Sequence, residues 1–174
     1  MIEVLIEEPG WQAHPLETWA EDAATLALTA RGLAPEAYEI SLLACSDDRI
    51  AALNADFRGK PAPTNVLSWP AFALAPEAPG ALPPLPPAGT PEAPIPLGDV
   101  AIALQTIETE ARTASKPLKN HVLHLILHGS LHLLGFDHLE DADAVVMERV
   151  ERQALATLGI PDPYLGDAAG PQTD

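Results

Sequence analysis

The chain is poor in basic residues. Only nine Lys and Arg side chains stand against 25 Asp and Glu side chains, and the formal net charge is −16 over 174 residues. A protein that binds nucleic acid through general electrostatics gains its affinity by neutralising phosphates with basic groups. This charge balance excludes that mode of binding for the chain as a whole. Any contact with RNA must therefore come from a local cleft that gathers the few basic residues.

Cysteine and long apolar runs are also scarce. Cys45 is the single cysteine, so an intramolecular disulfide is excluded, and its apolar neighbours indicate a buried thiol without a metal role. There is no apolar run of about 18 residues, and no basic, hydrophobic leader is recognisable. We therefore expect a cytoplasmic protein with no membrane partner. Hydrophobic residues make up 47% of the chain, which is enough for one domain with its own core.

Hydrophobic periodicity predicts an α+β fold, with a small mixed four-stranded sheet and about five helices. Strands are expected at 2–7, 39–45, 65–69 and 98–104, and helices at 16–31, 47–57, 105–115, 117–134 and 141–158. The helix at 117–134 is apolar nearly all round, which is typical of a helix buried at the centre of a domain. The histidines on this helix need partners, because an unpaired buried polar group is costly.

Prolines crowd the segment 71–97, together with alanine and few charges. We interpret it as a long, extended and mobile loop, inserted into a single domain that spans 1–165. A passive spacer is favoured over a segment that binds a partner. Residues 166–174 are small and polar and are expected to form a disordered tail.

Three histidines at the end of the central helix predict a metal site. His128 and His132 are four residues apart, so they lie on the same helical face, about 6 Å apart along the axis. Gly135 allows the chain to leave the helix through a left-handed conformation, and His138 can then return as a third ligand. Three nitrogen ligands leave a tetrahedral ion one open position, as in catalytic sites.

The spacing of these histidines also matches the long zincin pattern, except at one position. Gly129 stands where zincins have the glutamate that accepts a proton. A zinc-dependent peptidase or amidase is therefore an alternative that lacks its base. Zinc is the first choice of metal, and nickel, copper and iron remain open because imidazole suits them all.

Longer motifs around these residues resemble a known family. The run His124-Leu125-x-x-His128-Gly129-x-Leu131-His132-Leu133-x-Gly135-Phe136-Asp137-His138 is similar to the signature of the YbeY family of bacterial endoribonucleases. The blocks Leu-Asn-x-x-Phe-Arg-Gly-Lys at 53–60, Pro-Thr-Asn-Val-Leu-Ser-Trp-Pro at 63–70 and Leu-Gly-Asp-Val at 97–100 support the resemblance, which covers most of 1–160.

The resemblance implies a metal-dependent hydrolase: a single-strand-specific, zinc-dependent endoribonuclease. Its expected roles are maturation of the 3′ end of 16S ribosomal RNA and ribosome quality control. The expected partners are single-stranded ribosomal RNA and the small ribosomal subunit with its associated proteins, and no DNA is expected. A ribosome assembly factor that uses a structural metal without cleaving RNA is the non-enzymatic alternative.

Candidate catalytic residues are Arg58 and the three expected metal ligands, His128, His132 and His138. Negative charge grows on the phosphoryl oxygens during phosphodiester cleavage, and Arg58 is the candidate to stabilise it through a bidentate contact. The resemblance also implies an essential arginine at this position. Lys60 is a candidate for holding a neighbouring phosphate, with a solvated lysine as the alternative.

Other polar residues near these motifs have two interpretations each. His124 is a candidate for contacting RNA or supporting the metal site, and a packed histidine is the alternative. Asp137 orients an imidazole or caps the turn, while Glu140 and Asp141 are expected to cap the last helix. Three more residues bind substrate or belong to a turn that leads into a strand: Thr64, Asn65 and Ser68.

Overall fold

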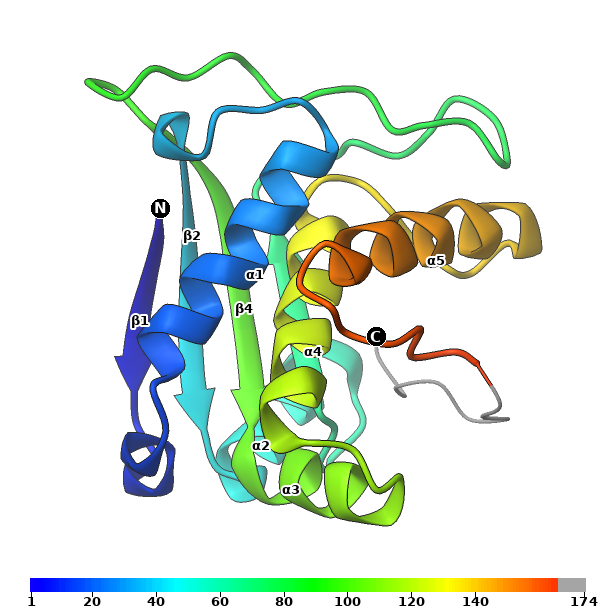
Figure 1. The fold of residues 1–174 in the computed structure, drawn as a ribbon. Coiled ribbons are helices and arrows are strands. Elements are labelled where there is room, and N and C mark those ends of the chain that lie inside the picture. The colour runs from blue at the N-terminus through cyan, green and yellow to red at the C-terminus, as the bar shows by residue number, and fades with distance from the viewer. Residues whose placement is uncertain (166–174) are drawn as a thin grey trace.

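The sheet has four strands in the order β1-β2-β4-β3 (Figure 1). The computed structural model describes residues 1–165. β2 (Tyr38–Cys45) pairs in parallel with both β1 (Ile2–Ile6) and β4 (Ile95–Ala103), and β3 (Val66–Pro70) is antiparallel to β4. The predicted α+β fold with a mixed four-stranded sheet is therefore confirmed. The expected tail at 166–174 lies outside the described residues.

Helices cover the two faces of the sheet unequally. In chain order the described helices are η1 (Pro9–Ala13), α1 (Leu16–Ala30), η2 (Pro35–Ala37), α2 (Asp47–Arg58), α3 (Leu104–Thr113), α4 (Leu118–Leu133) and α5 (Asp141–Ala156). α1 and α4 lie side by side on one face, and α5 packs beside them, in contact with both (Figure 1). No helix in the described range combines the length and hydrophobicity that crossing a bilayer requires.

α4 is the central helix of this arrangement. Its middle, from His121 to Leu131, is buried all round. Gly129 faces the sheet, where a Cβ atom would lie 2.9 Å from Val100 Cγ1 and 3.3 Å from Val66 Cγ2. The missing side chain lets α4 lie directly on β3 and β4. The central buried helix that carries the histidines is therefore confirmed.

α2 packs on the opposite face of the sheet through a second, smaller core. Ile50 lies there with side chains from the ends of three strands, among them Cys45, Leu67 and Ala101. Ser46 accepts a hydrogen bond from the backbone N–H of Arg49 and so caps the helix. Burial, with a smaller contribution from Glu7, raises the pKa of the Cys45 thiol to about 12. The expectation of a buried thiol is thus confirmed.

The proline-rich loop is shorter than predicted, because β4 begins at Ile95 and not at 98. Pro96 pairs with Glu39 next to a register shift, after which Ile40 pairs with Gly98. Proline is tolerated in a strand beside such an irregularity, where its missing N–H leaves no gap in the ladder. Because prolines are typical of loops, the start of this strand was predicted at 98, three residues after its actual start at Ile95.

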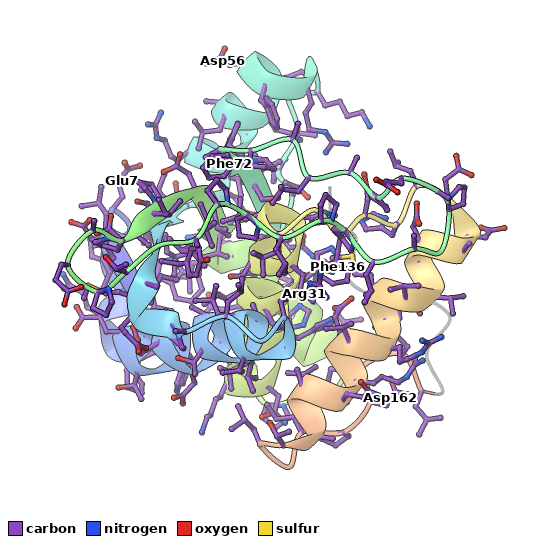
Figure 2. The ribbon with its side chains drawn as sticks, turned by 90° about the horizontal axis from the view of Figure 1, so that it is seen from above. Glu7, Arg31, Asp56, Phe72, Phe136 and Asp162 are labelled. Atoms are coloured by element: carbon purple, nitrogen blue, oxygen red, sulfur yellow. The ribbon has the colours of Figure 1, made fainter. Side chains whose placement is uncertain are left out.

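The proline-rich loop runs from the sheet to α5 (Figures 1 and 2). Hydrogen bonds to other parts of the protein hold it in place. The Arg31 guanidinium donates to the Pro83 carbonyl at 2.7 Å and also lies over the Phe136 ring, 5.8 Å from its centroid. The backbone N–H of Gly80 donates to Asp143 on α5 at 2.8 Å. These contacts connect the loop to the turn that carries His138, which a passive spacer does not require.

Candidate metal centre

Three histidine side chains converge where α4 ends. The Nε2 atoms of His128 and His132 lie 3.0 Å apart, as expected for residues one turn apart on the same face. The ring of His138 returns from the following turn, with its centroid 5.3 Å from that of His128 and 5.2 Å from that of His132. One nitrogen from each ring lies within 4.8 Å of the other two. Within the described residues, no fourth His, Cys, Asp or Glu joins this group.

The turn that brings His138 back depends on Gly135. Its φ angle is +95°, and a Cβ atom there would lie 2.3 Å from the Leu74 carbonyl oxygen. Glycine is therefore required both by conformation and by space. Asp137 accepts a hydrogen bond from the backbone N–H of His138 at 2.7 Å, so its carboxylate caps the turn. Of the two interpretations of Asp137, capping is the one observed.

The hydrogen bonds of the rings direct their lone pairs toward one another. His132 donates its Nδ1–H to the Phe136 carbonyl at 2.8 Å, which leaves its Nε2 unprotonated. His128 directs Nδ1 at a Glu151 carboxylate oxygen 3.2 Å away, so its Nε2 is also the acceptor nitrogen. Two facing lone pairs repel unless a cation lies between them. Nitrogens bound tetrahedrally at 2.0–2.1 Å are separated by about 3.3 Å, so the observed spacing fits a metal ion.

Electrostatics also favours neutral rings here. Burial, together with the neighbouring His128 and His138, lowers the pKa of His132 to about 3. Burial and His128 likewise lower the pKa of His138 below its ordinary value. Both rings are therefore unprotonated near neutral pH, which is the form that binds a metal.

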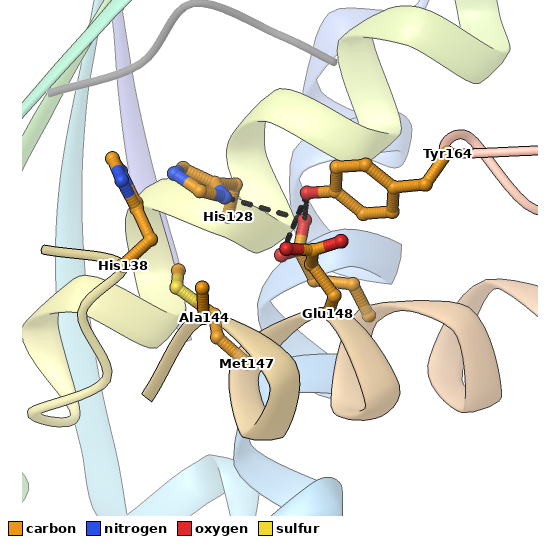
Figure 3. Close-up of a pocket in the computed structure, with 7 residues that line it drawn as sticks. His128, His138, Ala144, Met147, Glu148 and Tyr164 are labelled. Carbon is orange, nitrogen blue, oxygen red and sulfur yellow. Dashed lines mark hydrogen bonds and ion pairs between the residues drawn. The ribbon is translucent and has the colours of Figure 1, made fainter. Parts of the chain in front are cut away.

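A cavity of about 220 Å³ lies beside the histidines, between α4 and α5 (Figure 3). His128 and His138 form one wall of it, and α5 forms the opposite wall. The lining residues from α5 and the segment after it are Ala144, Met147, Glu148, Glu151 and Tyr164. The candidate centre is thus reached from the α5 side.

The two predicted basic residues lie elsewhere. Arg58 and Lys60 are exposed at the C-terminal end of α2 and just after it, and neither lines this cavity. Between them Gly59 ends the helix with φ +68°. The fold brings the three histidines together at the end of α4, whereas Arg58 and Lys60 lie at the end of α2.

His124 is packed inside the protein, which argues against the expected contact with RNA. It is 2% exposed, and its Nε2 is hydrogen-bonded to Glu151. Asn65 is also an internal residue, since its side chain donates to Glu110 at 3.0 Å and accepts from the backbone N–H of Val66. Glu140 occupies the N-cap position of α5, but its side chain makes no capping hydrogen bond.

Sequence reasoning missed the carboxylate behind the histidines. Glu151 is fully buried, and it lies on the same face of α5 as the buried residues Met147, Ala154 and Leu155. A charged residue in an otherwise apolar stripe of a helix is a signal that could have identified it. Tyr164, which contacts this carboxylate, follows α5 in a segment with no comparable pattern.

Fold and site together define an α+β protein in which two histidines of a buried central helix, and a third from the turn after it, are able to hold a metal ion. The family model described as Endoribonuclease YbeY matches residues 3–159, and the chain belongs to this family. The resemblance drawn from the motifs is thereby confirmed.

Individual relatives agree over nearly the whole chain. A protein named Endoribonuclease YbeY from Jannaschia sp. is 52% identical over 163 residues, which cover 94% of this chain and 99% of the relative. One of the same name from Dinoroseobacter shibae is 53% identical, over 94% of this chain and 90% of the relative. A Thermotoga maritima protein solved in solution has a TM-score of 0.54 over 97% of this chain and 99% of its own. At 20% identity, that similarity concerns the fold alone.

Proposed function

We propose that this protein is a metal-dependent endoribonuclease that cleaves single-stranded RNA. The observation that carries the proposal is the convergence of three imidazoles beside a cavity, in a chain whose relatives are named endoribonucleases. Following the family resemblance, the proposed substrate is ribosomal RNA, with roles in 16S 3′-end maturation and ribosome quality control. The small ribosomal subunit and its proteins are the proposed partners, and the cytoplasm remains the predicted location.

His128, His132 and His138 are the proposed ligands of one zinc ion, with nickel as the alternative metal. When bound, the ion supplies Lewis acidity toward a phosphodiester and toward a water molecule. The Phe136 carbonyl and the Glu151 carboxylate accept the Nδ1 protons of His132 and His128. The Nε2 atoms of both rings therefore remain unprotonated and able to bind the ion. The cavity on the α5 side leaves open space next to His128 and His138.

Arg58 is the proposed residue that stabilises charge on the phosphoryl oxygens, and Lys60 the proposed contact to a neighbouring phosphate. Both are exposed, so their charged ends are accessible to a polyanion. A guanidinium makes two parallel hydrogen bonds to a phosphate, which suits the geometry of the transition state. Because the chain has a net charge of −16, RNA is expected to bind only where such positive side chains are exposed.

The peptidase alternative is weakened by the position of Gly129. Zincins have their glutamate base there, but in this protein the position is pressed against Val100 and Val66 of the sheet. A glutamate side chain at this position would not fit on the sheet side of α4. The packing therefore supports phosphodiester chemistry over the zincin mechanism.

The test is cleavage by zinc-loaded protein of a labelled single-stranded segment of ribosomal RNA, the same segment in a duplex, and casein. We expect cleavage of the single strand only, lost with a chelator and restored by zinc. Protein carrying His14→Gln, a histidine outside the cluster, is the matched control and should remain active. Zinc-loaded protein that binds small subunits without cutting RNA would establish the assembly-factor alternative, and chelator-sensitive casein hydrolysis would establish the peptidase.

A further inference from the structure

Glu151 is a fully buried carboxylate whose oxygens are both hydrogen-bonded. It accepts hydrogen bonds from His124 Nε2 and, at 3.2 Å, from His128 Nδ1. The Tyr164 hydroxyl donates to both of its oxygens at 3.0 Å. Figure 3 marks the hydrogen bonds of His128 and Tyr164 with dashed lines. Three donors from α4 and from the segment after α5 thus meet at one side chain.

Such an arrangement needs an explanation beyond stability. A buried charge is costly even when it is paired, and well-packed apolar residues often replace a buried ion pair without loss of stability. Burial alone would raise the pKa of Glu151, but His128 and the hydrogen bond from His124 lower it below its ordinary value. Burial and the charge of Glu151 raise the pKa of Tyr164, so its hydroxyl stays protonated and remains a donor.

One ring nitrogen each of His124 and His128 and a carboxylate oxygen of Glu151 lie within 4.8 Å of one another, close enough to hold a second metal ion. That interpretation is disfavoured because both imidazoles direct a ring nitrogen at the same oxygen, Oε2 of Glu151. The hydrogen bonds already occupy the space between the rings and the carboxylate. A cation there would also remove the Nδ1 proton of His128, which fixes its Nε2 as the acceptor.

We propose that Glu151 is a positioning residue for the three-histidine centre and acts through His128. By holding the Nδ1 proton, it fixes the tautomer and the rotation of the ring, so that the Nε2 lone pair faces His132. Tyr164 and His124 hold the carboxylate in turn, and Tyr164 lines the same cavity. The inference rests on the proposed function only in assuming that an ion binds at the three histidines.

The test is zinc affinity, measured by competition with a chromophoric chelator, for Glu151→Ala, Glu151→Gln and Tyr164→Phe. We expect Glu151→Ala to weaken zinc binding by about 10- to 100-fold. Glu151→Gln keeps an oxygen acceptor for the Nδ1 proton, so its loss should be clearly smaller. Tyr164→Phe should weaken affinity by only a few fold and keeps the positioning testable if Glu151→Ala does not fold.

The matched control is Glu110→Gln. Glu110 also pairs with a histidine of α4, since it lies 2.9 Å from His121 Nε2, but His121 is outside the three-histidine group. This variant should change stability and leave zinc affinity unchanged. In spectra of ¹⁵N-labelled, zinc-loaded protein, His128 should carry its proton on Nδ1, and this signal should be lost or mixed in Glu151→Ala.

Two outcomes would overturn the inference. One is that folded Glu151→Ala, Glu151→Gln and Tyr164→Phe bind zinc as tightly as the original protein, differing only in melting temperature. The other is that the three Glu151 and Tyr164 variants lose no more affinity than Glu110→Gln does. If the original protein binds zinc at the three histidines but cuts no RNA, the proposed function fails while the inference stands.

Discussion

The histidine centre and the end of α2 are built in opposite ways. At the centre, each ring of α4 is held by a second group, Phe136 for His132 and Glu151 for His128. At the end of α2, Arg58 is the exposed last residue of the helix, and Lys60 is exposed just after it. The rings of the first region are oriented by hydrogen bonds within the protein, whereas the second region lies on the exposed surface. The comparison contrasts side chains that hydrogen bonds orient within the protein with charged side chains exposed to solvent.

The largest effect is expected when one of the three proposed metal ligands is removed. His132→Gln should lose stoichiometric zinc binding and lower the rate of RNA cleavage by at least roughly 10³-fold, because losing a single stabilising donor already costs 10²–10³. Zinc content by elemental analysis and initial cleavage rates provide the measurement. His14→Gln should match the original protein in both, and equal zinc content in the two variants would contradict the assignment.

The sequence predicted the three histidines of the metal centre, but it did not predict Glu151, which holds one of their rings in place. The 128, 132 and 138 spacing and Gly135 were enough to predict convergence, because helix periodicity and a left-handed turn are local properties. Glu151 lies 23 residues from His128, and no local pattern links the two. The packing of α5 on α4 brings them together.

Other parts of the fold and the site also depend on contacts between segments. The sequence left two interpretations of His124 open, because a shared helical face does not distinguish a residue that contacts RNA from a packed one; its hydrogen bond with Glu151 identifies it as packed. The start of β4 was missed because the prolines around it are typical of loops, and the register shift that accommodates Pro96 is a property of two strands. Strand pairing and helix packing were therefore the parts that a single segment could not reveal.

The turn between the two ligand positions offers a second way to disturb the centre. Gly135→Ala should lower the free energy of unfolding by about 2–5 kcal/mol, because alanine is strained at φ +95° and its Cβ would meet the Leu74 carbonyl. The measurement is urea unfolding of chelator-treated protein, followed by zinc affinity. Gly32→Ala is the control: its φ is +68° but no atom lies within 4 Å of a Cβ there. Equal losses in both variants would show that the space around Gly135 is unimportant.

The end of α2 is tested by removing a charge without changing the fold. Arg58→Ala should lower kcat/KM on single-stranded RNA by roughly 10²-fold, as expected when a group that stabilises transition-state charge is lost. The melting temperature should change little, because substitutions of exposed side chains usually alter stability by no more than about 0.5 kcal/mol. Arg112→Ala removes another exposed arginine from the last turn of a helix and should keep full activity. Comparable activity of the two variants would remove Arg58 from the proposed mechanism.

The smallest expected effect is a pH dependence of the empty centre. In the folded protein the pKa of His132 is about 3, against an ordinary value of 6.5. Above pH 6.5 neither the folded nor the unfolded state binds a proton at this ring, so it contributes no pH dependence there. As the pH falls below 6.5, the unfolded state takes up a proton that the folded state does not, and stability decreases by up to about 1.4 kcal/mol per pH unit.

This slope is measured by urea unfolding in chelator between pH 7.5 and 5, a range that spans the ordinary pKa of histidine. His132→Gln removes the titrating ring, so its curve should be shallower by the contribution of one proton. The lowered pKa of His138 acts in the same direction, and some slope should therefore remain in the variant. Parallel curves for the two proteins would mean that His132 is not held neutral by burial, and the centre would then be less organised than its hydrogen bonds imply.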